Sequence, residues 1–250
     1  MLAEQRRQEI LKMLRAEGAL SARAVAERLG VSLATVRRDM SMLHGDGRLH
    51  RVHGGALLGE ANEPSFEDVA VTHPEAKDRL ARRAATLVPD GAVVLCDIGT
   101  SVHHVAAHLH GRPLTVVTNS LAVYEELKDD VAIDLVLLGG QVRRNYRSMV
   151  GFLTEQALEQ VHADLLFLGT SGVRGDGSVM DTTTVEVPVK RAMLRSADRT
   201  ALVADGSKFP GSGLARVCGP ERLNFLVTDE DADPGTLDVV RQAGAEVVLA

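Results

Sequence analysis

The pattern of hydrophobic and polar positions changes once along the chain. Over residues 1–57, hydrophobic residues recur three or four positions apart, which is typical of short amphipathic helices. From residue 75 onward, short runs rich in Val and Leu alternate with helical stretches. We therefore expect two domains, over residues 1–57 and 75–250. The linker between them, residues 58–74, carries Asn-Glu-Pro and His-Pro loop signals.

Three helices are expected in the first domain, over residues 4–17, 21–29 and 32–46. Ser21 and Ser32 suit the starts of the second and third helices, because a serine hydroxyl accepts a hydrogen bond from a free amide in the first helical turn. The glycine between these two helices permits the sharp turn that a helix-turn-helix motif needs.

The third helix has one hydrophobic face and a small, basic outer surface. Val36, Met40 and Leu43 recur at helical spacing and predict the buried face. Arginine can chelate guanine or hold a phosphate, and threonine can touch a thymine methyl group, so we predict that the outer surface enters a DNA major groove. The candidate residues at the N-cap and on the outer surface are Ser32, Ala34, Thr35, Arg37, Arg38 and Ser41.

Residues 48–56 predict a short β-ribbon. Leu49 and Val52 are expected to point inward from it. The basic side chains offered to DNA phosphates are Arg48, His50, Arg51 and His53. Helices and ribbon together predict a winged helix-turn-helix DNA-binding domain. The alternative is a small helical bundle with a solvated charged face, and the agreement of caps, turn, periodicity and ribbon disfavours it.

The second domain predicts an α/β fold, with a mainly parallel sheet and helices on both faces. The expected strands cover residues 92–96, 115–117, 133–138, 165–168, 200–204, 224–227 and 246–249. The expected helices cover residues 76–87, 102–109, 121–128, 151–161, 185–197 and 236–243.

In such sheets a ligand binds at the carboxyl ends of the strands, and polar residues gather there. Gly99 lets the backbone approach a ligand, while Thr100 and Ser101 supply hydroxyls at the start of a helix, an arrangement that suits phosphate. Hydroxyls, an amide, carboxylates and cations at one rim suit a phosphorylated polyol. The candidate effector-binding residues are Asp97, Gly99, Thr100, Ser101, Asn119, Gly140, Arg143, Glu186, Lys190 and Lys208.

Each candidate also has a plainer interpretation. The Gly-Thr-Ser turn is open to being only a turn, and Asn119 to being only a helix cap. Arg143 would then belong to a solvated face. Lys190 would only pair with Glu186 four residues earlier.

Charge separates the two domains. The whole chain of 250 residues has a net charge of −6, which by itself argues against a nucleic-acid partner. Residues 1–57 hold ten Lys and Arg against six Asp and Glu, whereas residues 58–250 hold eighteen against twenty-eight. The basic end is therefore the expected DNA-binding end.

The remaining composition predicts an ordinary globular protein of the cytoplasm. No apolar run approaches the roughly 18 residues of a membrane helix, and the N-terminus has no apolar signal core. Cys96 and Cys218 are expected to be reduced core thiols. The His residues are scattered, so we expect neither a metal site nor a cofactor.

The residues also carry a family resemblance. The segment LSARAVAERLGVS at residues 20–32, with TVRRD at 35–39 and HGGA at 53–56, resembles the N-terminal domain of the DeoR family of bacterial sugar-operon repressors. Six later motifs are similar to the sensor domain of that family: DIGTS from residue 97, VTNS from 117, LGG from 138, DLLFLG from 164, VKRAML from 189 and DGSKF from 205.

This resemblance implies a sensor domain related to ribose-5-phosphate isomerase and glucosamine-6-phosphate deaminase. It also implies a phosphorylated sugar effector and a homo-oligomer, a dimer or tetramer. Ser101 stands where a second Thr is common, Gly206 where Ser is common, and Val69 where an Arg is frequent. The last departure bears on how the linker contacts the sensor domain.

Two functions of different classes follow. The first is a transcriptional repressor whose affinity for a double-stranded DNA operator is controlled by a phosphorylated sugar. The second is a sugar-phosphate isomerase or deaminase that carries a DNA-binding domain. Its chemistry would need a carboxylate base and an acid or cation, for which Asp97, Asp181, Glu186 and Lys190 are available. Nothing in their spacing requires catalysis, so we favour the repressor.

Overall fold

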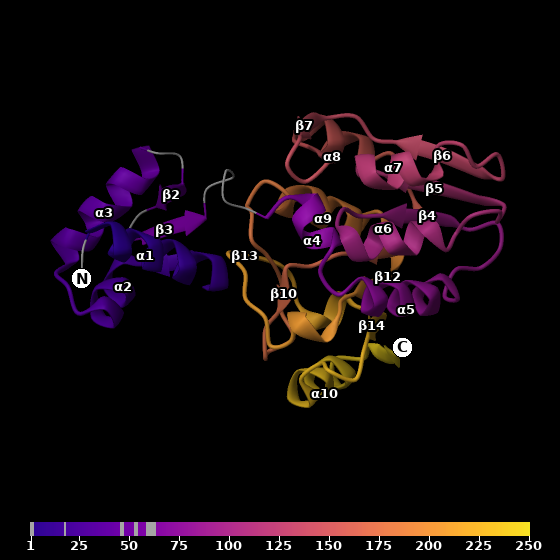
Figure 1. Ribbon diagram of the computed structural model, residues 1–250. Coiled ribbons are helices and arrows are strands. Elements are labelled where there is room, and N and C mark those ends of the chain that lie inside the picture. Colours follow the sequence, from indigo (N-terminus) through magenta and orange to yellow (C-terminus); the bar gives the residue numbers. More distant parts are fainter. Residues whose placement is uncertain (1–2, 18, 46–47, 53–54, 59–63) are drawn as a thin grey trace.

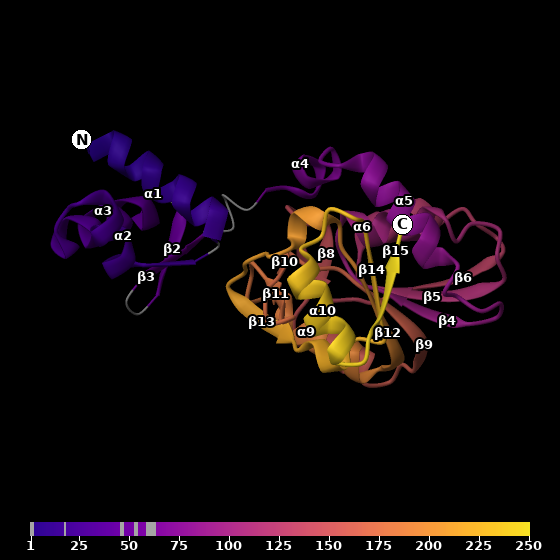
Figure 2. The same cartoon turned by 90° about the horizontal axis from the view of Figure 1, so that it is seen from below.

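The computed structural model describes residues 3–17, 19–45, 48–52, 55–58 and 64–250. The N-terminal part is a helical unit with a small sheet, and residues after 64 form a larger α/β unit (Figures 1 and 2). None of the helices in the described ranges is long and apolar enough to cross a membrane.

The three predicted N-terminal helices are confirmed. They are α1 (Ala3–Glu17), α2 (Ala22–Leu29) and α3 (Leu33–Gly45). The Ser21 hydroxyl accepts a hydrogen bond from the Ala24 amide at 3.0 Å and so caps α2. Gly30 ends α2 in the left-handed conformation, with φ of 63°, where a side chain would be strained. The predicted face of α3, namely Val36, Met40 and Leu43, lies in the core of this unit.

The predicted β-ribbon is present and has a third strand. The strands are β1 (Ala19–Ser21), β2 (Leu49–Val52) and β3 (Gly55–Leu58), in the order β1-β3-β2 and all antiparallel. A Cβ on Gly55 would lie 2.2 Å from the Leu20 carbonyl oxygen, so this close pairing requires glycine. Leu49 is buried as predicted. The direction of Val52 lies outside the described side chains.

A seven-stranded parallel sheet forms the centre of the larger unit and confirms all seven predicted strands. They are β4 (Val93–Cys96), β5 (Leu114–Thr118), β6 (Ile133–Leu137), β9 (Ala163–Leu168), β12 (Ala197–Val203), β14 (Phe225–Thr228) and β15 (Glu246–Leu249). Their order is β15-β14-β12-β9-β4-β5-β6, and every neighbouring pair is parallel.

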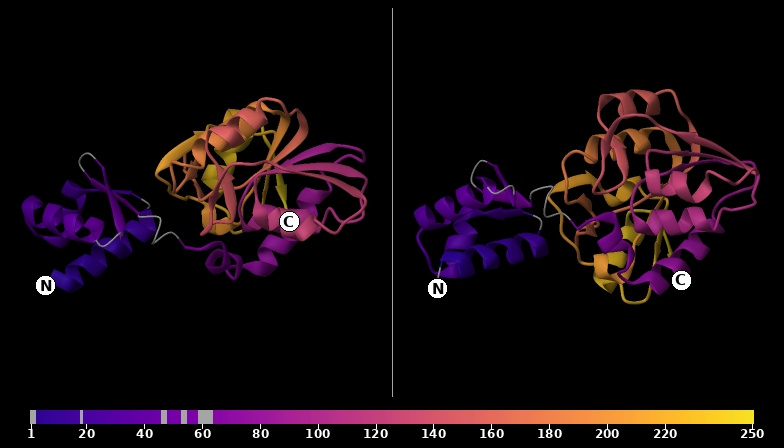
Figure 3. Two further views of the ribbon diagram at one scale, coloured as in Figure 1. Left: turned by 90° about the horizontal axis from the view of Figure 1, so that it is seen from above. Right: turned by 45° about the horizontal axis from the view of Figure 1, so that its top comes forward.

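Helices cover both faces of this sheet, as Figure 3 shows. The six predicted helices are confirmed as α5 (Pro74–Ala85), α6 (Thr100–Ala107), α7 (Leu121–Leu127), α8 (Phe152–Leu158), α9 (Val187–Arg195) and α10 (Pro234–Gln242). Successive strand residues pack on opposite faces. Leu166 belongs to the core beneath α8, α9 and α10, whereas Leu165 and Phe167 belong to the core beneath α5, α6 and α7.

Several short elements beside the sheet were not predicted. A hairpin pairs β7 (Gln141–Arg143) with β8 (Ser148–Val150), and a small antiparallel sheet joins β10 (Gly172–Val173), β11 (Val179–Asp181) and β13 (Ala215–Cys218). The stretch predicted as a linker also contains a helix, α4 (Phe66–Ala70), and α5 begins one residue before the predicted domain start.

The order of the strands marks one place in the sheet. From β4 the chain proceeds to β5 and β6 on one side, and then returns to β9, β12, β14 and β15 on the other. The chain direction therefore reverses between β4 and β9, and such a switch point leaves a crevice at the carboxyl ends of the strands.

Candidate functional site

The outer surface of α3 is free to meet a large partner. Arg37 and Arg38 are exposed, and the guanidinium group of neither makes a hydrogen bond or ion pair with any described residue. Ala34 and Ser41 are exposed beside them, and Thr35 is half-buried. Two unpaired guanidinium groups on one exposed helix form a surface that fits DNA bases and phosphates.

Hydroxyl groups at the start of α3 hold the helix rather than point away from it. The Ser32 hydroxyl accepts a hydrogen bond from the Thr35 amide at 3.1 Å and lies 2.9 Å from the Thr35 hydroxyl. The Ser41 hydroxyl donates to the Arg37 carbonyl at 2.7 Å. The Ser32 and Thr35 hydroxyls thus help to fix the first turn of α3.

Helix α3 is held in position by an ion pair that the sequence did not predict. Arg6 of α1 donates from Nε to the buried Asp39 carboxylate at 2.5 Å. Asp39 lies among the hydrophobic positions of α3, and Arg6 lies 33 residues away, so the pairing depends on how the helices pack. The contact fixes the rotation of α3 against α1.

The predicted phosphate contacts of the β-ribbon are only partly described. Arg48 is half-buried and has a partner within the described chain. Arg51 lies on β2, but its side chain is outside the described set, as is that of His50. His53 lies outside the described residues altogether. For His50, Arg51 and His53, contact with DNA phosphates therefore stays a prediction.

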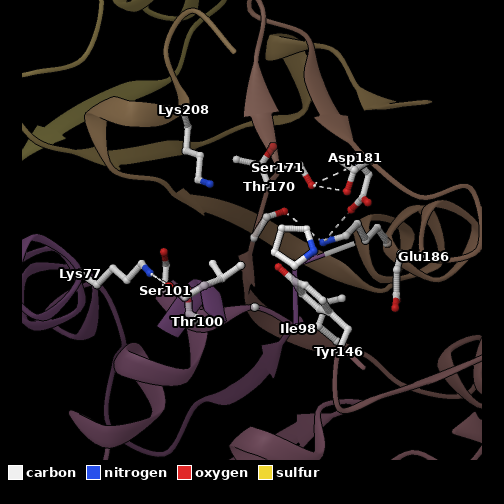
Figure 4. A pocket seen from close by; sticks show the side chains of 16 residues that line it. Lys77, Ile98, Thr100, Ser101, Tyr146, Thr170, Ser171, Asp181, Glu186 and Lys208 are labelled. Atoms are coloured by element: carbon white, nitrogen blue, oxygen red, sulfur yellow. Dashed lines mark hydrogen bonds and ion pairs between the residues drawn. The ribbon is translucent and has the colours of Figure 1, made fainter. Parts of the chain in front are cut away.

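A cavity of about 150 Å³ lies at the switch point between β4 and β9. Ile98–Ser101 after β4 and Gly169–Ser171 after β9 form its floor. A single water needs roughly 10–15 Å³, so the cavity has room for a small metabolite. Figure 4 shows side chains from α5, the start of α6, β11 and α9 converging on it.

The start of α6 is shaped to receive an anion. Gly99 adopts φ of 108°, a region that side chains rarely reach, and it leads into the first turn of α6 at Thr100 and Ser101. No Gly99 group caps this eight-residue helix. Gly99, Thr100 and Ser101 thus line the cavity at the positive end of the helix dipole.

Two lysines face the same end of the cavity. Lys208, a candidate because it follows a strand, lies after β12 in a 3₁₀ turn at Gly206–Lys208 and lines the cavity. Lys77 of α5 also lines the cavity and is only 2% exposed, but the sequence analysis did not include it among the candidate residues. Lys77 stands three residues before the buried Leu80, on the apolar face of α5. A lysine on an apolar helix face is the feature of the sequence that could have revealed it.

Lys77 is held by neutral oxygens. Its ammonium donates to the Val69 carbonyl at 2.6 Å and to the Thr72 hydroxyl at 3.4 Å. Burial, against the attraction of Asp205 and together with the repulsion of Lys208, lowers the pKa of Lys77 from 10.5 to about 8. An anion placed beside Lys77 would remove this penalty on its charged form.

Lys190 of α9 lies at the centre of a buried charge network. Its ammonium donates to the Asp97 carboxylate and, at 3.1 Å, to the Gly169 carbonyl, and it lies 3.7 Å from Asp181. Burial disfavours the charge of Lys190, but Asp97 and Asp181 outweigh it and raise its pKa. The alternative of a simple pair with Glu186 is wrong, because the lysine points to β4 instead.

Glu186 connects the cavity to the β7–β8 hairpin. Its Oε1 accepts hydrogen bonds from Arg143 at 2.5 Å and from the Ser148 hydroxyl at 2.7 Å. Its Oε2 is buried without a hydrogen-bond partner among the described residues. Burial raises the pKa of Glu186 and outweighs these two donors. One oxygen of Glu186 thus orders the hairpin while the other is unused.

Not all predicted effector residues reach the cavity. Gly99, Thr100, Ser101, Glu186, Lys190 and Lys208 line it. Asp97 lies directly behind Lys190. Asn119 is fully buried and donates to the Met149 carbonyl. Gly140 packs against β8 and α8, and a Cβ on it would lie 2.1 Å from the Thr154 hydroxyl of α8. Arg143 donates to Glu186 but does not line the cavity. Asn119, Gly140 and Arg143 therefore belong to the structure around the cavity.

Comparison with known proteins places both parts of the chain. A family model described as the DeoR-like helix-turn-helix domain matches residues 6–61, and one described as the DeoR C terminal sensor domain matches residues 72–230. The chain belongs to the DeoR family. It is a DNA-binding transcriptional regulator with a sensor domain, and the resemblance seen in the sequence is confirmed.

Curated relatives within this family match over nearly their whole length. A putative aga operon transcriptional repressor of Escherichia coli O157:H7 is 31% identical over 98% of this chain and 93% of its own. A glycerol-3-phosphate regulon repressor of Haemophilus influenzae is 33% identical over 98% and 96%. A lactose phosphotransferase system repressor of Streptococcus mutans is 33% identical over 92% and 93%.

Solved structures give more distant likenesses. Ribose 5-phosphate isomerase A from Methanocaldococcus jannaschii shares 15% identity, with a TM-score of 0.41 over 55% of each chain. A probable sor operon regulator from Shigella flexneri shares 11% identity, with a TM-score of 0.44 over 67% of this chain and 88% of its own.

Within the described residues of this DeoR-family chain, no group of three or more His, Cys, Asp or Glu side chains is placed to hold a metal ion. Cys96 and Cys218 are buried and free, and burial raises the pKa of each thiol to about 12. The polar side chains that line the cavity offer ammonium groups, carboxylates and hydroxyls.

Proposed function

We propose that this DeoR-family regulator is a repressor of a carbohydrate-metabolism operon and that a phosphorylated sugar or a related metabolite controls its affinity for DNA. The names of its relatives support the choice of operon, since they are repressors of the aga operon, the glycerol-3-phosphate regulon and a lactose phosphotransferase system. DNA binding rests on Arg37, Arg38 and Thr35 at bases and on Arg48 and Arg51 at phosphates.

The observation that carries the effector proposal is the two-sided chemistry of the cavity. Lys77 and Lys208 lie on one side of it and Asp181 and Glu186 on the other (Figure 4). The cationic side, with the start of α6, suits a phosphate group. Carboxylates accept hydrogen bonds from hydroxyls, so the other side suits the polyol part of the same molecule.

We propose no catalytic role for this cavity. Two of the candidate carboxylates are held by structural partners: Asp97 by Lys190, and one oxygen of Glu186 by Arg143 and Ser148. Incubation of the purified protein with ribose 5-phosphate and glucosamine 6-phosphate tests this. Turnover that disappears in Asp97→Asn or Glu186→Gln would revive the enzyme alternative.

The working form is proposed to be a homo-oligomer, a dimer or tetramer, because paired helix-turn-helix units bind paired half-sites on DNA. Sedimentation velocity at micromolar concentration, with and without operator DNA, tests this. A monomer that binds a single half-site at full affinity would contradict it.

The effector proposal is tested by fluorescence anisotropy on DNA from upstream of the gene itself and of its neighbours. The protein is titrated alone and with glycerol 3-phosphate, ribose 5-phosphate or glucose 6-phosphate. We expect one phosphate to change the DNA affinity by about five- to a hundred-and-fifty-fold, the usual size of allosteric coupling. Lys208→Met should abolish this response and keep DNA binding. A response to none of the compounds in the panel would remove the account of the cavity.

A further inference from the structure

The first helix after the DNA-binding domain is short and carefully capped. Helix α4 has only five residues, and Ser65 caps it in a reciprocal arrangement with Asp68. The Ser65 hydroxyl accepts from the Asp68 amide at 3.1 Å, and the Asp68 carboxylate accepts from the Ser65 amide at 3.0 Å. So short a helix is not stable alone in water, so α4 depends on the surface to which it docks.

Phe66 is the anchor of that docking. It is 4% exposed, and its ring meets the edge of His103 on α6, with 5.7 Å between the centroids. The ring also meets Tyr146 at 6.4 Å and lies beneath the Arg147 guanidinium at 5.4 Å. The Phe66 amide donates to the Asn145 carbonyl at 2.9 Å. The turn of the β7–β8 hairpin and α6 thus form the docking surface of α4.

The same segment is a wall of the cavity. Pro64 and Val69 line it together with Tyr146, the residue that also holds Phe66. Lys77, which faces the cavity from α5, donates to the Val69 carbonyl near the end of α4. Helix α4 is therefore fixed at one end by the hairpin and at the other by a lysine of the ligand site. Figures 1 and 2 show α4 where the chain arrives from the N-terminal domain.

The Lys77 ammonium has three N–H donors, and it lies against α4 because two of them go to the Val69 carbonyl and the Thr72 hydroxyl. A charged hydrogen bond to phosphate is stronger than one to a neutral carbonyl, so Lys77 would turn to the phosphate. We propose that a phosphate in the cavity withdraws Lys77 from Val69 and so undocks residues 64–70, which connect the cavity to the DNA-binding domain. This inference rests on the proposed function, and it supplies the step by which the ligand site controls the DNA-binding domain.

The test is amide hydrogen exchange of the full chain with and without saturating glycerol 3-phosphate, ribose 5-phosphate, glucose 6-phosphate or inorganic phosphate. With the phosphate that binds, we expect faster exchange of peptides over residues 64–72 and slower exchange over residues 97–104, with no change in α10. Slower exchange over 97–104 with unchanged or slower exchange over 64–72 would overturn the inference and leave the proposed function standing. No change anywhere with any probe would remove both.

Variants separate docking from general folding. Phe66→Ala should give fast exchange over 64–72 with or without phosphate and reduce the effect of phosphate on DNA affinity to less than twofold. Ser65→Ala leaves every docking contact of Phe66 in place and removes only the cap, so it should shift both measurements part of the way. Phe152→Ala is the matched control, because this phenylalanine is 68% exposed on α8 and should change neither. A full phosphate response in Phe66→Ala would overturn the inference.

Discussion

Lys77 is a side chain whose buried charge weakens the fold. A buried ammonium held by two neutral oxygens is costly, and its pKa of about 8 expresses that cost. The folded protein therefore binds fewer protons at Lys77 than the unfolded chain does between about pH 8 and 10.5. The penalty on stability is complete below pH 8 and is lost as the pH rises to 10.5.

We predict that Lys77→Met raises the free energy of unfolding by about 1–3 kcal/mol at pH 7. The gain should shrink between pH 8 and 10.5, because wild type recovers its stability there. Urea denaturation at a series of pH values measures it, with the exposed Lys128→Met as control. The same variant should bind phosphates more weakly than wild type. A stability gain that does not depend on pH would mean that Lys77 is not strained by its charge.

Lys190 has the opposite role, because its charge is matched by carboxylates. We predict that Lys190→Met lowers the free energy of unfolding by about 3–5 kcal/mol, since Asp97 would be left buried and unpaired. The double variant Lys190→Met/Asp97→Asn should recover part of that loss. Urea denaturation of the wild type, both single variants and the double variant forms the necessary cycle. Strictly additive losses would contradict a direct pairing.

At the scale of elements, α3 and the β-ribbon are expected to read DNA differently. We predict that Arg38→Ala weakens binding to the operator more than binding to unrelated DNA, because an exposed arginine of α3 reaches base edges. Arg51→Ala should weaken both and reduce the salt slope by roughly one, as expected for a phosphate contact. Anisotropy at several salt concentrations measures both variants. Equal losses on both DNAs for Arg38→Ala would show that it reads no base.

The seven sheet strands were predictable because parallel strands with helices on both faces are hydrophobic throughout. Leu165, Leu166 and Phe167, for example, are all buried, and the sequence shows an unbroken run. The hairpin β7–β8 has three residues a strand and two exposed positions in β7, so it leaves no such run. Short strands of this kind depend on their partners, and local sequence does not reveal them.

The site was predictable where its groups follow strands and not where they arrive from elsewhere. Gly99, Thr100 and Lys208 stand at strand ends, so their convergence follows from the sheet alone. Lys77 reaches the cavity from the apolar face of α5, and its partner Val69 lies in a stretch that reads as linker. Asn119 also stands at a strand end, but its side chain donates to the Met149 carbonyl of β8. Its direction therefore depends on the hairpin, which the sequence did not predict.

At the scale of the whole molecule, the two halves have opposite charge and complementary tasks. The basic N-terminal domain is drawn to DNA, while the acidic sensor domain is repelled by it, which favours approach by α3 first. Residues 58–74 are the connection along the chain between the cavity and the DNA-binding domain. The coupling free energy between two such sites is the same whichever ligand binds first.

We predict that the coupling is reciprocal. If a phosphate changes the affinity for operator DNA by a given factor, the operator must change the affinity for that phosphate by the same factor. Calorimetric titration of the phosphate into free and DNA-bound protein measures the second factor, and anisotropy measures the first. Ser65→Ala should reduce the two factors equally, because it removes the cap that stabilises α4 and touches neither ligand. Factors that remain unequal at the same salt and temperature would mean that phosphate and DNA act on different oligomeric forms of the protein.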